Sequence, residues 1–300
     1  MSTTTTPKPA PPATPNIAIY TGGDPTDENI STLFNDIAAG TYTTVVLWAA
    51  HVDSFGNINM NDDPVAQNGK LVSSAQAWAK LVAGLKSAPK TTINRVELSI
   101  GGDSTSFANI ASLVSQYGSG SSNPLYPNLQ ILQAALNLDA INYDDESEYD
   151  PKSSADLAAM SANLGMRVSI CPFTNQQYWV NLVTAINKSN PGTADAVYLQ
   201  CYDGGADNTY DLPSWNNSFQ PTGLNIAPGM WATHEEGTPP VCTTSTSASQ
   251  AETQMAKWAQ QTSLAGGWMF CGTDMLNCPG GGTPADYSTA IASGLKQSSR

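Results

Sequence analysis

The 300-residue sequence has little charge, and most of what it has is negative. Only 12% of the residues are charged, with 12 Lys and Arg against 25 Asp and Glu, which gives a formal net charge of −13 at pH 7. Nucleic acids and anionic membrane surfaces bind clusters of Lys and Arg, so we expect neither as a partner. No apolar run approaches the roughly 18 residues of a membrane span, although the 40% of hydrophobic residues can form a large core.

The start of the sequence lacks the apolar segment of a secretory signal peptide. Residues 1–15, MSTTTTPKPAPPATP, are rich in Thr and Pro, a composition typical of a flexible or polyproline-like tail. For the chain as given we therefore expect a cytoplasmic location or non-classical release. We expect secretion if the natural chain carries an export signal ahead of this sequence.

Cysteines are few and lack the spacing of a metal site. There are five, with no CxxC pair among them, so the sequence predicts neither a zinc site nor a disulfide framework. Cys242 and Cys278 lie in segments rich in Gly, Pro and Thr and could form one bridge. The other three are expected to be buried free thiols: Cys171, Cys201 and Cys271.

Beyond the tail, short apolar runs alternate with longer amphipathic segments to the end of the chain. Eight runs rich in Val, Ile, Leu and Tyr predict strands. They are 16–23, 43–50, 95–102, 138–145, 166–173, 196–203, 224–232 and 266–272. The helical patterns lie at 28–40, 73–86, 105–118, 154–165, 178–188, 249–261 and 284–296. Asp27 is the predicted N-cap of the first helix, which should end at Gly40.

This alternation predicts an α/β fold of parallel strands joined by right-handed crossovers. The simplest closed arrangement is a single (β/α)8 barrel over residues 16–300. An open doubly wound sheet is the alternative, although the glycine-rich GxGxxG turn typical of such sheets is absent. No linker or second domain is apparent after residue 16.

The fourth predicted strand runs into a cluster of acids, LDAINYDDESEY at 138–149. Side chains alternate along a strand, so Asn142, Asp144 and Glu146 share one face. If that face points inward, Asp144 and Glu146 lie side by side at the barrel mouth. Burial and mutual repulsion would then raise their pKa values, so that one carboxyl could act as a general acid near neutrality. An acidic turn exposed to solvent explains the same residues equally well.

The strand motifs resemble those of glycoside hydrolase family 18, the chitinases and endo-β-N-acetylglucosaminidases. The family's D-x-x-D-x-D-x-E pattern is matched at 139–146 with Asn142 at its second acidic position, and S-x-G-G is matched at 99–102. Weaker matches are Q-x-Y at 200–202, GG-x-M at 266–269 and the first strand, IAIYTGG. The doubled Asp before Glu146 is similar to the endo-β-N-acetylglucosaminidases.

The resemblance implies a retaining glycosidase that cleaves β-1,4 linkages at N-acetylglucosamine, in N-glycan cores or in chitin. Glu146 would protonate the glycosidic oxygen, and the substrate's own acetamido oxygen would attack the anomeric carbon, an exception to the two-carboxylate scheme. Asp144 would bind the acetamido N–H and Tyr202 its oxygen. The resemblance implies a monomer without metal or organic cofactor. The remaining predicted sugar-site residues are Asn142, Gln200, Tyr20, Gly102 and Trp231, of which Gln200 and Tyr20 suit barrel filling equally well.

The sequence departs from the family pattern in two side chains and in one segment. Asn142 replaces an Asp that assists Asp144, which should slow turnover without abolishing it. Cys271 stands where chitinases place the Trp that floors the sugar site. Trp48, Trp231 and Trp215 are candidates to replace its aromatic surface, although each suits the core or the rim better. Residues 232–250 are too few for the α+β module inserted in some chitinases, so the groove should be shallow.

Two other functions remain open. The first is a binding protein on the same scaffold, a lectin or a glycosidase inhibitor, which Asn142 and Cys271 favour and which the retained Asp144 and Glu146 disfavour. The second is a storage protein, in line with the low charge and the abundant Asn, Gln, Thr and Ser.

Overall fold

The computed structural model describes residues 14–297 except 103, 203–207 and 237–240. Eight parallel strands form a closed barrel, because β1 pairs with both β2 and β13. The predicted (β/α)8 barrel is confirmed, and the open doubly wound sheet is wrong. Residues 1–13 of the predicted tail lie outside the described residues. The barrel strands are β1 (Asn16–Tyr20), β2 (Thr44–Val52), β6 (Arg95–Gly102), β7 (Ala140–Asp145), β8 (Arg167–Ile170), β9 (Ala194–Gln200), β10 (Ile226–Trp231) and β13 (Gly266–Phe270).

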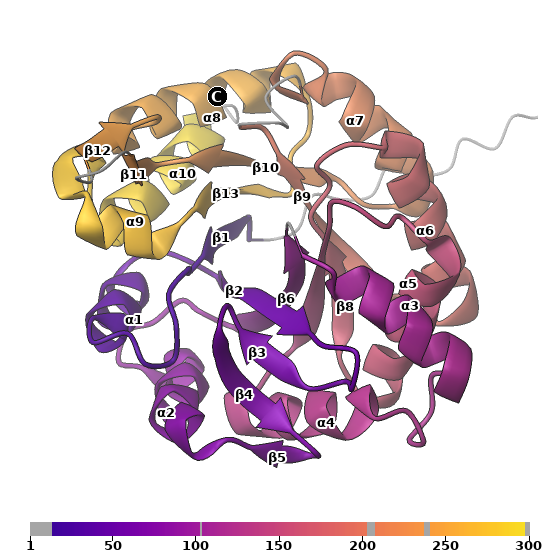
Figure 1. Ribbon diagram of the computed structural model, residues 1–300. Coiled ribbons are helices and arrows are strands. Elements are labelled where there is room, and N and C mark those ends of the chain that lie inside the picture. The colour runs from indigo at the N-terminus through magenta and orange to yellow at the C-terminus, as the bar shows by residue number, and fades with distance from the viewer. Residues whose placement is uncertain (1–13, 103, 203–207, 237–240, 298–300) are drawn as a thin grey trace, which may run out of the picture.

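Helices surround the barrel on the outside (Figure 1). The helices predicted from periodicity are present. The periodicity did not predict α4, which has a Pro in its first turn, or α7 and α9, which are short. Asp27 is not the N-cap of α1, as Asn29 takes that place and donates its backbone N–H to the Asp27 carboxylate at 2.8 Å. No helix in the described ranges is long and apolar enough to cross a membrane. The helices are α1 (Ile30–Ala39), α2 (Gln76–Gly84), α3 (Ser106–Tyr117), α4 (Leu125–Leu136), α5 (Pro151–Asn163), α6 (Gln176–Ser189), α7 (Leu212–Phe219), α8 (Ala248–Gln261), α9 (Gly272–Asn277) and α10 (Pro284–Gln297).

Two antiparallel additions extend the barrel. After β2 the chain forms β3 (Ile58–Met60), β4 (Asp63–Gln67) and β5 (Lys70–Leu71), which continue the sheet outward from the end of β2. Between β10 and α8 lies the hairpin of β11 (Thr233–Glu236) and β12 (Val241–Thr244). As its length predicted, this segment holds a hairpin and not an inserted α+β module in its described part.

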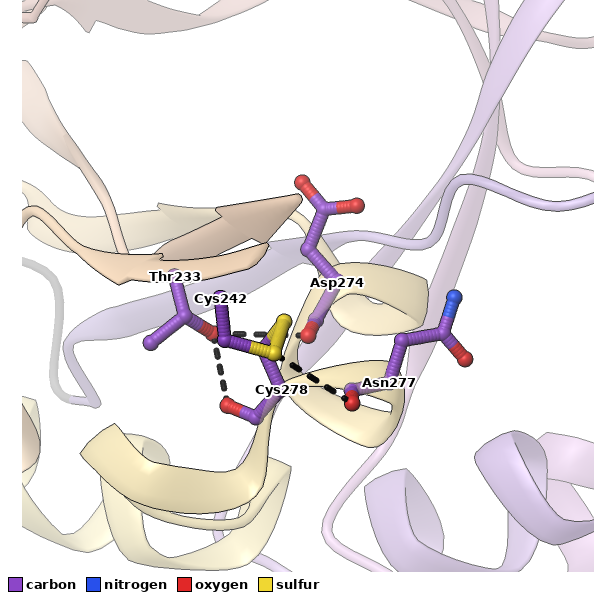
Figure 2. The surroundings of a disulfide bond; sticks show 5 residues. All are labelled: Thr233, Cys242, Asp274, Asn277 and Cys278. Carbon is purple, nitrogen blue, oxygen red and sulfur yellow. Dashed lines mark hydrogen bonds between the residues drawn. A yellow bond between two sulfur atoms is a disulfide. The ribbon is translucent and has the colours of Figure 1, made fainter. Parts of the chain in front are cut away.

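The disulfide predicted as one possibility is present. Cys242 on β12 bonds to Cys278, directly after α9, and Thr233 Oγ1 donates to the Cys278 carbonyl at 3.0 Å (Figure 2). The hairpin is thereby fixed to the end of α9. Cys171, Cys201 and Cys271 are buried free thiols, as expected.

The alternation of side chains divides the core into two layers. Inside the barrel lies a small cluster that includes Tyr20, Tyr198 and Trp268, whereas the larger cluster fills the space between strands and helices. On β7, Ile141 and Tyr143 belong to the outer cluster, and the Tyr143 hydroxyl donates to the Ser154 carbonyl of α5 at 3.2 Å. Asn142 and Asp144 therefore point inward, as their parity predicted.

Loss of the Cys242–Cys278 bridge should destabilise the protein. The bridge joins residues 36 positions apart, and a loop of that size corresponds to about 3–4 kcal/mol of unfolding free energy. Thermal unfolding with and without a reductant measures the effect, and Cys242→Ser/Cys278→Ser is the control that a reductant should leave unchanged. Equal melting temperatures for the oxidised and reduced protein would contradict this expectation.

Candidate active site

The side chains of Asp144 and Glu146 lie close together at the C-terminal end of β7. One amide holds them together, because Gln200 Nε2 donates to Asp144 Oδ1 at 3.1 Å and to Glu146 Oε1 at 2.9 Å. Gln200 lies at the end of β9, two strands away in the barrel. The acidic run is therefore not a solvent-exposed turn at these positions, since Asp144 is only 3% exposed.

The carboxyl groups line a pocket of about 170 Å³ that is rich in aromatic rings. Tyr202 stacks on Phe270 with 5.7 Å between ring centroids, and Trp48 meets Phe270 edge-on at 5.0 Å. Rings combined with a few polar groups are typical of a sugar site, because the ring faces cover the apolar side of a pyranose. The lining residues are Tyr20, Trp48, Asp144, Glu146, Phe173, Gln200, Tyr202, Trp231 and Phe270.

Asp144 is placed so that it keeps a proton near neutral pH. Burial raises its pKa to about 7, and the charge of Glu146 adds to that shift. The indole of Trp48 acts in the opposite direction, because its Nε1–H donates to Asp144 Oδ2 at 2.9 Å and favours the ionised form. Near neutrality the two carboxyl groups can thus share a proton.

Asp145, the second member of the doubled Asp, has a structural role. Its Oδ1 accepts hydrogen bonds from the backbone N–H groups of Ser147 and Glu148, and its Oδ2 accepts one from Tyr149 at 2.8 Å. These bonds shape the loop that follows Glu146. The second Asp of the pair is therefore explained by the shape of this loop and gives no information about the substrate.

Asn142 lies beneath the pocket and not on its surface. Its Oδ1 accepts from Tyr20 Oη at 3.1 Å and from Ser99 Oγ at 2.8 Å, while its Nδ2 donates to Ser169 Oγ at 2.8 Å. Asn142 is therefore not among the residues that line the pocket, although it was predicted to bind the sugar. Asn142 instead orients Tyr20, which does line the pocket.

The polar contacts continue from Asn142 toward the opposite end of the barrel. Ser169 Oγ donates to Glu97, which is fully buried and also accepts from Tyr198 Oη at 2.9 Å and from Arg95 Nε at 2.5 Å. Arg95 in turn makes a two-point ion pair with Asp195, at 2.8 and 2.7 Å. Burial alone would lower the pKa of Arg95, but Glu97 and Asp195 outweigh it and raise that pKa. The barrel thus encloses one polar column, defined here as these residues from Tyr20 to Asp195.

The structure brings most of the predicted site residues together. Six of them line the pocket: Tyr20, Asp144, Glu146, Gln200, Tyr202 and Trp231. Gly102 is not among the lining residues but lies behind them, since a Cβ there would be 3.6 Å from Trp48 and 3.9 Å from Asp144 Oδ2. Its neighbour Gly101, at φ +125°, is required sterically, because a Cβ there would lie 2.1 Å from the Asp144 carbonyl oxygen.

Aromatic rings line the pocket although Cys271 stands where the family pattern has a Trp. Cys271 is buried outside the pocket, with its Sγ 3.5 Å from Thr273 Oγ1, and the preceding residue, Phe270, lines the pocket. Strand parity could have identified Phe270, since it shares a face with Trp268. Trp48 and Trp231 supply further aromatic surface, whereas Trp215 stacks on Phe219 of α7, away from the pocket. Phe173, on the loop after β8, carried no sequence signal.

Three solved structures illustrate what this fold is similar to. The catalytic domain of a family GH18 chitinase from the fern Peteris ryukyuensis is 15% identical, with a TM-score of 0.59 over 93% of this chain and 98% of that one. A family GH18 chitinase from Cycas revoluta in complex with allosamidin is 10% identical, with a TM-score of 0.63 over 93% and 99% of the two chains. A chitinase-like agglutinin from Robinia pseudoacacia is 12% identical, with a TM-score of 0.59 over 93% and 99%.

These likenesses establish the fold. The chain has the barrel of the family GH18 chitinases and chitinase-like proteins, as the strand motifs predicted. No family model and no curated protein matches the sequence. Because the similar structures include both chitinases and an agglutinin, the question of activity depends on the site residues themselves.

Removal of the charge at Glu97 should cost substantial stability. Glu97→Gln leaves the Arg95 guanidinium with Asp195 as its one acidic partner, and disruption of a buried ion pair lowers the unfolding free energy by about 3 kcal/mol. Urea denaturation measures this change. The control is Asp156→Asn, in an ion pair whose Lys152 side chain is 78% exposed, where we expect no measurable loss of stability because solvent screens the pair. Equal losses in both variants would contradict a structural role for the polar column.

Proposed function

We propose that the protein is a retaining glycoside hydrolase that cleaves β-1,4 linkages at N-acetylglucosamine, with Glu146 as the general acid. The observation that carries the proposal is the shared amide of Gln200, which holds Asp144 and Glu146 side by side at the mouth of an aromatic pocket. The pKa of about 7 for Asp144 supports a proton held in this pair at physiological pH. The fold of the GH18 chitinases agrees with the same chemistry.

In the proposed reaction, Glu146 gives its proton to the glycosidic oxygen as that bond breaks. The carbonyl oxygen of the substrate's 2-acetamido group attacks the anomeric carbon from the opposite face and forms a cyclic oxazolinium ion. Water then attacks the anomeric carbon, Glu146 takes up a proton from it, and the ring opens with overall retention of configuration. No second enzyme carboxylate is required as nucleophile.

Asp144 and Tyr202 position the acetamido group in this scheme. Asp144 accepts a hydrogen bond from its N–H and stabilises the positive charge that develops on the oxazolinium. Burial raises the pKa of Tyr202, which keeps its hydroxyl protonated and able to donate to the acetamido oxygen. Tyr202 also stacks on Phe270, so its ring has little freedom to move.

The size and lining of the pocket support a sugar as the substrate. A cavity of about 170 Å³ suits a single sugar ring, and Trp48, Trp231 and Phe270 offer it aromatic faces. Since Asp145 is explained by the loop that it shapes, the doubled Asp no longer favours N-glycan cores over chitin. Both substrates are therefore included in the test, and the proposed partner is a glycan that contains N-acetylglucosamine.

One observation supports a second candidate function, a carbohydrate-binding protein without turnover. Asn142 cannot ionise, and all of its polar atoms are engaged with Tyr20, Ser99 and Ser169, so it cannot exchange a proton with Asp144. The similar agglutinin from Robinia pseudoacacia has the same fold. Both functions use the same pocket and differ in whether the glycan is cleaved.

Glu146→Gln should abolish most of the activity. Loss of a general acid lowers kcat by about 10²–10⁴-fold, measured as release of glycan from a high-mannose glycoprotein or of sugar from a chitin oligomer. Glu148→Gln, two residues away and exposed to solvent, is the matched control and should retain full activity. Binding without release, with equal affinity in wild type and Glu146→Gln, would establish the second candidate function.

The activity should fall as the pH rises through about 7. Below that pH the Asp144–Glu146 pair holds the proton needed for catalysis, and above it the pair loses that proton. Trp48→Phe removes the indole bond that lowers the pKa of Asp144, so the alkaline limb should move to higher pH. Phe270→Leu removes an aromatic ring but no hydrogen-bond donor and should leave the limb in place. A limb that Trp48→Phe shifts to lower pH would rule out this assignment.

A further inference from the structure

The loop that carries Glu146 joins β7 to α5, and a carboxyl group anchors it at each end. Asp145 accepts hydrogen bonds from the backbone N–H groups of residues 147–149. Asp150 is the N-cap of α5 and accepts from two backbone N–H groups in the first turn of that helix. These bonds fix the backbone of the loop, but they lie within one segment of the chain and do not attach it to the neighbouring loop of the barrel mouth.

Tyr149 connects the Glu146 loop to the loop that follows β8. Its hydroxyl lies 3.1 Å from Thr174 Oγ1, and either group can be the donor. The ring of Tyr149 meets Tyr178 and Trp179 of α6 edge-on, with 5.3 and 6.1 Å between ring centroids. Trp179 also donates its indole N–H to the Thr174 carbonyl at 2.9 Å. Ring packing on one side and this bond on the other therefore direct the two hydroxyl groups toward each other.

The backbone of Tyr149 lies in the left-handed region, at φ +47°. This conformation is unfavourable for a residue with a Cβ, and Asn tolerates it better than most. Four of the five other described non-glycine residues with positive φ are Asn, and the fifth is Lys90. A large aromatic residue at such a position indicates that its side chain has a use that outweighs the unfavourable backbone.

The loop that Tyr149 contacts is attached to the aromatic pocket. Thr174 directly follows Phe173, which lines the pocket. Asn208 Nδ2 donates to the Phe173 carbonyl at 3.1 Å and to the Gln200 carbonyl at 2.8 Å, which joins this loop to the end of β9. The side chain of Gln200 in turn donates to Glu146 at 2.9 Å. The contact between the two loops thus closes a circuit of hydrogen bonds that begins and ends at the Glu146 loop.

We propose that Tyr149 is a positioning residue, which holds the Glu146 loop against the loop after β8 and so keeps the Glu146 carboxyl beside Asp144. Tyr149 is not among the residues that line the pocket, so it acts through Glu146. Its effect on catalysis rests on the proposed function, because a precisely placed general acid matters only in a hydrolase. The placement of the carboxyl does not rest on it and can be measured without turnover.

Tyr149→Phe tests the placement, since it removes the hydroxyl and keeps the ring. Burial and the charge of Glu146 raise the pKa of Asp144. If the Glu146 carboxyl is no longer held in place, its repulsion weakens, and Asp144 should titrate at a lower pH than in wild type. The other groups that act on Asp144 are unchanged by the substitution, and they are Trp48, Cys171 and Asp145.

The titration is followed by ¹³C NMR of protein labelled at the Asp carboxyl carbons, and the resonance absent in Asp144→Asn identifies the reporter. Thr174→Val removes the other hydroxyl of the pair and should lower the Asp144 midpoint to the same extent as Tyr149→Phe. Thr174→Ser keeps a hydroxyl at that position and should titrate like wild type.

On a chitin oligomer, Tyr149→Phe and Thr174→Val should each lower kcat about three- to tenfold, the usual effect of one hydrogen bond. KM should change little, because a displaced acid impairs bond cleavage more than sugar binding. The double variant should lose no more than either single variant, since both remove the same bond. Losses that multiply in the double variant would contradict a role through this contact.

Tyr178→Phe is the matched control. Tyr178 belongs to the same group of rings, but its hydroxyl pairs with Ser154 Oγ of α5 at 3.0 Å, so the Asp144 midpoint and kcat should stay as in wild type. An Asp144 midpoint that Tyr149→Phe leaves unchanged or raises would overturn the proposal, whether or not the protein is active. A lowered midpoint in a protein that releases no sugar would refute the hydrolase and support the placement. In an active enzyme, an unchanged kcat would refute the role in catalysis.

Discussion

The desolvation of Asp144 is the constraint on which the site depends. A carboxyl group that is 3% exposed inside a barrel has its charged form destabilised, and Glu146 nearby makes ionisation harder still. Hydrogen bonds from the amide of Gln200 and the indole of Trp48 act against this destabilisation of the charged form. The balance between these opposing effects keeps a proton available to the pair near neutral pH, which is the property that a general acid needs.

The polar column below the pocket gives this arrangement a rigid base. Hydrogen bonds link its members from Asn142 through Ser169 to Glu97 and Arg95. Asn142 suits its place for a specific reason: its Nδ2 donates to Ser169, whose hydroxyl donates onward to Glu97. An ionised Asp in its place could not make that first bond. Asn142, which departs from the Asp of the chitinase pattern, therefore completes a hydrogen-bond chain in this protein.

Strands β9 and β10 separate the aromatic pocket from a second cavity of about 540 Å³ on the outside of the barrel. Gln200 and Trp231 face one, while Cys201 and Met230 face the other. The inner side presents paired carboxyl groups and aromatic rings, and the outer side presents mainly hydroxyl and amide groups. The alternation of side chains along these two strands thus gives the two sides of the sheet different linings.

The sequence by itself determined the eight strands, their parallel order and the inward face of β7, because periodicity and strand parity are local properties of the chain. It also placed Asp144, Glu146, Gln200 and Tyr202 at the strand ends where a barrel collects its site. Only the tertiary structure decided that Phe270 and not Cys271 lines the pocket, that Asn142 lies beneath the pocket, and that Trp48 donates to Asp144. Those outcomes depend on how side chains from strands far apart in the sequence meet across the barrel, and no local pattern encodes such distances.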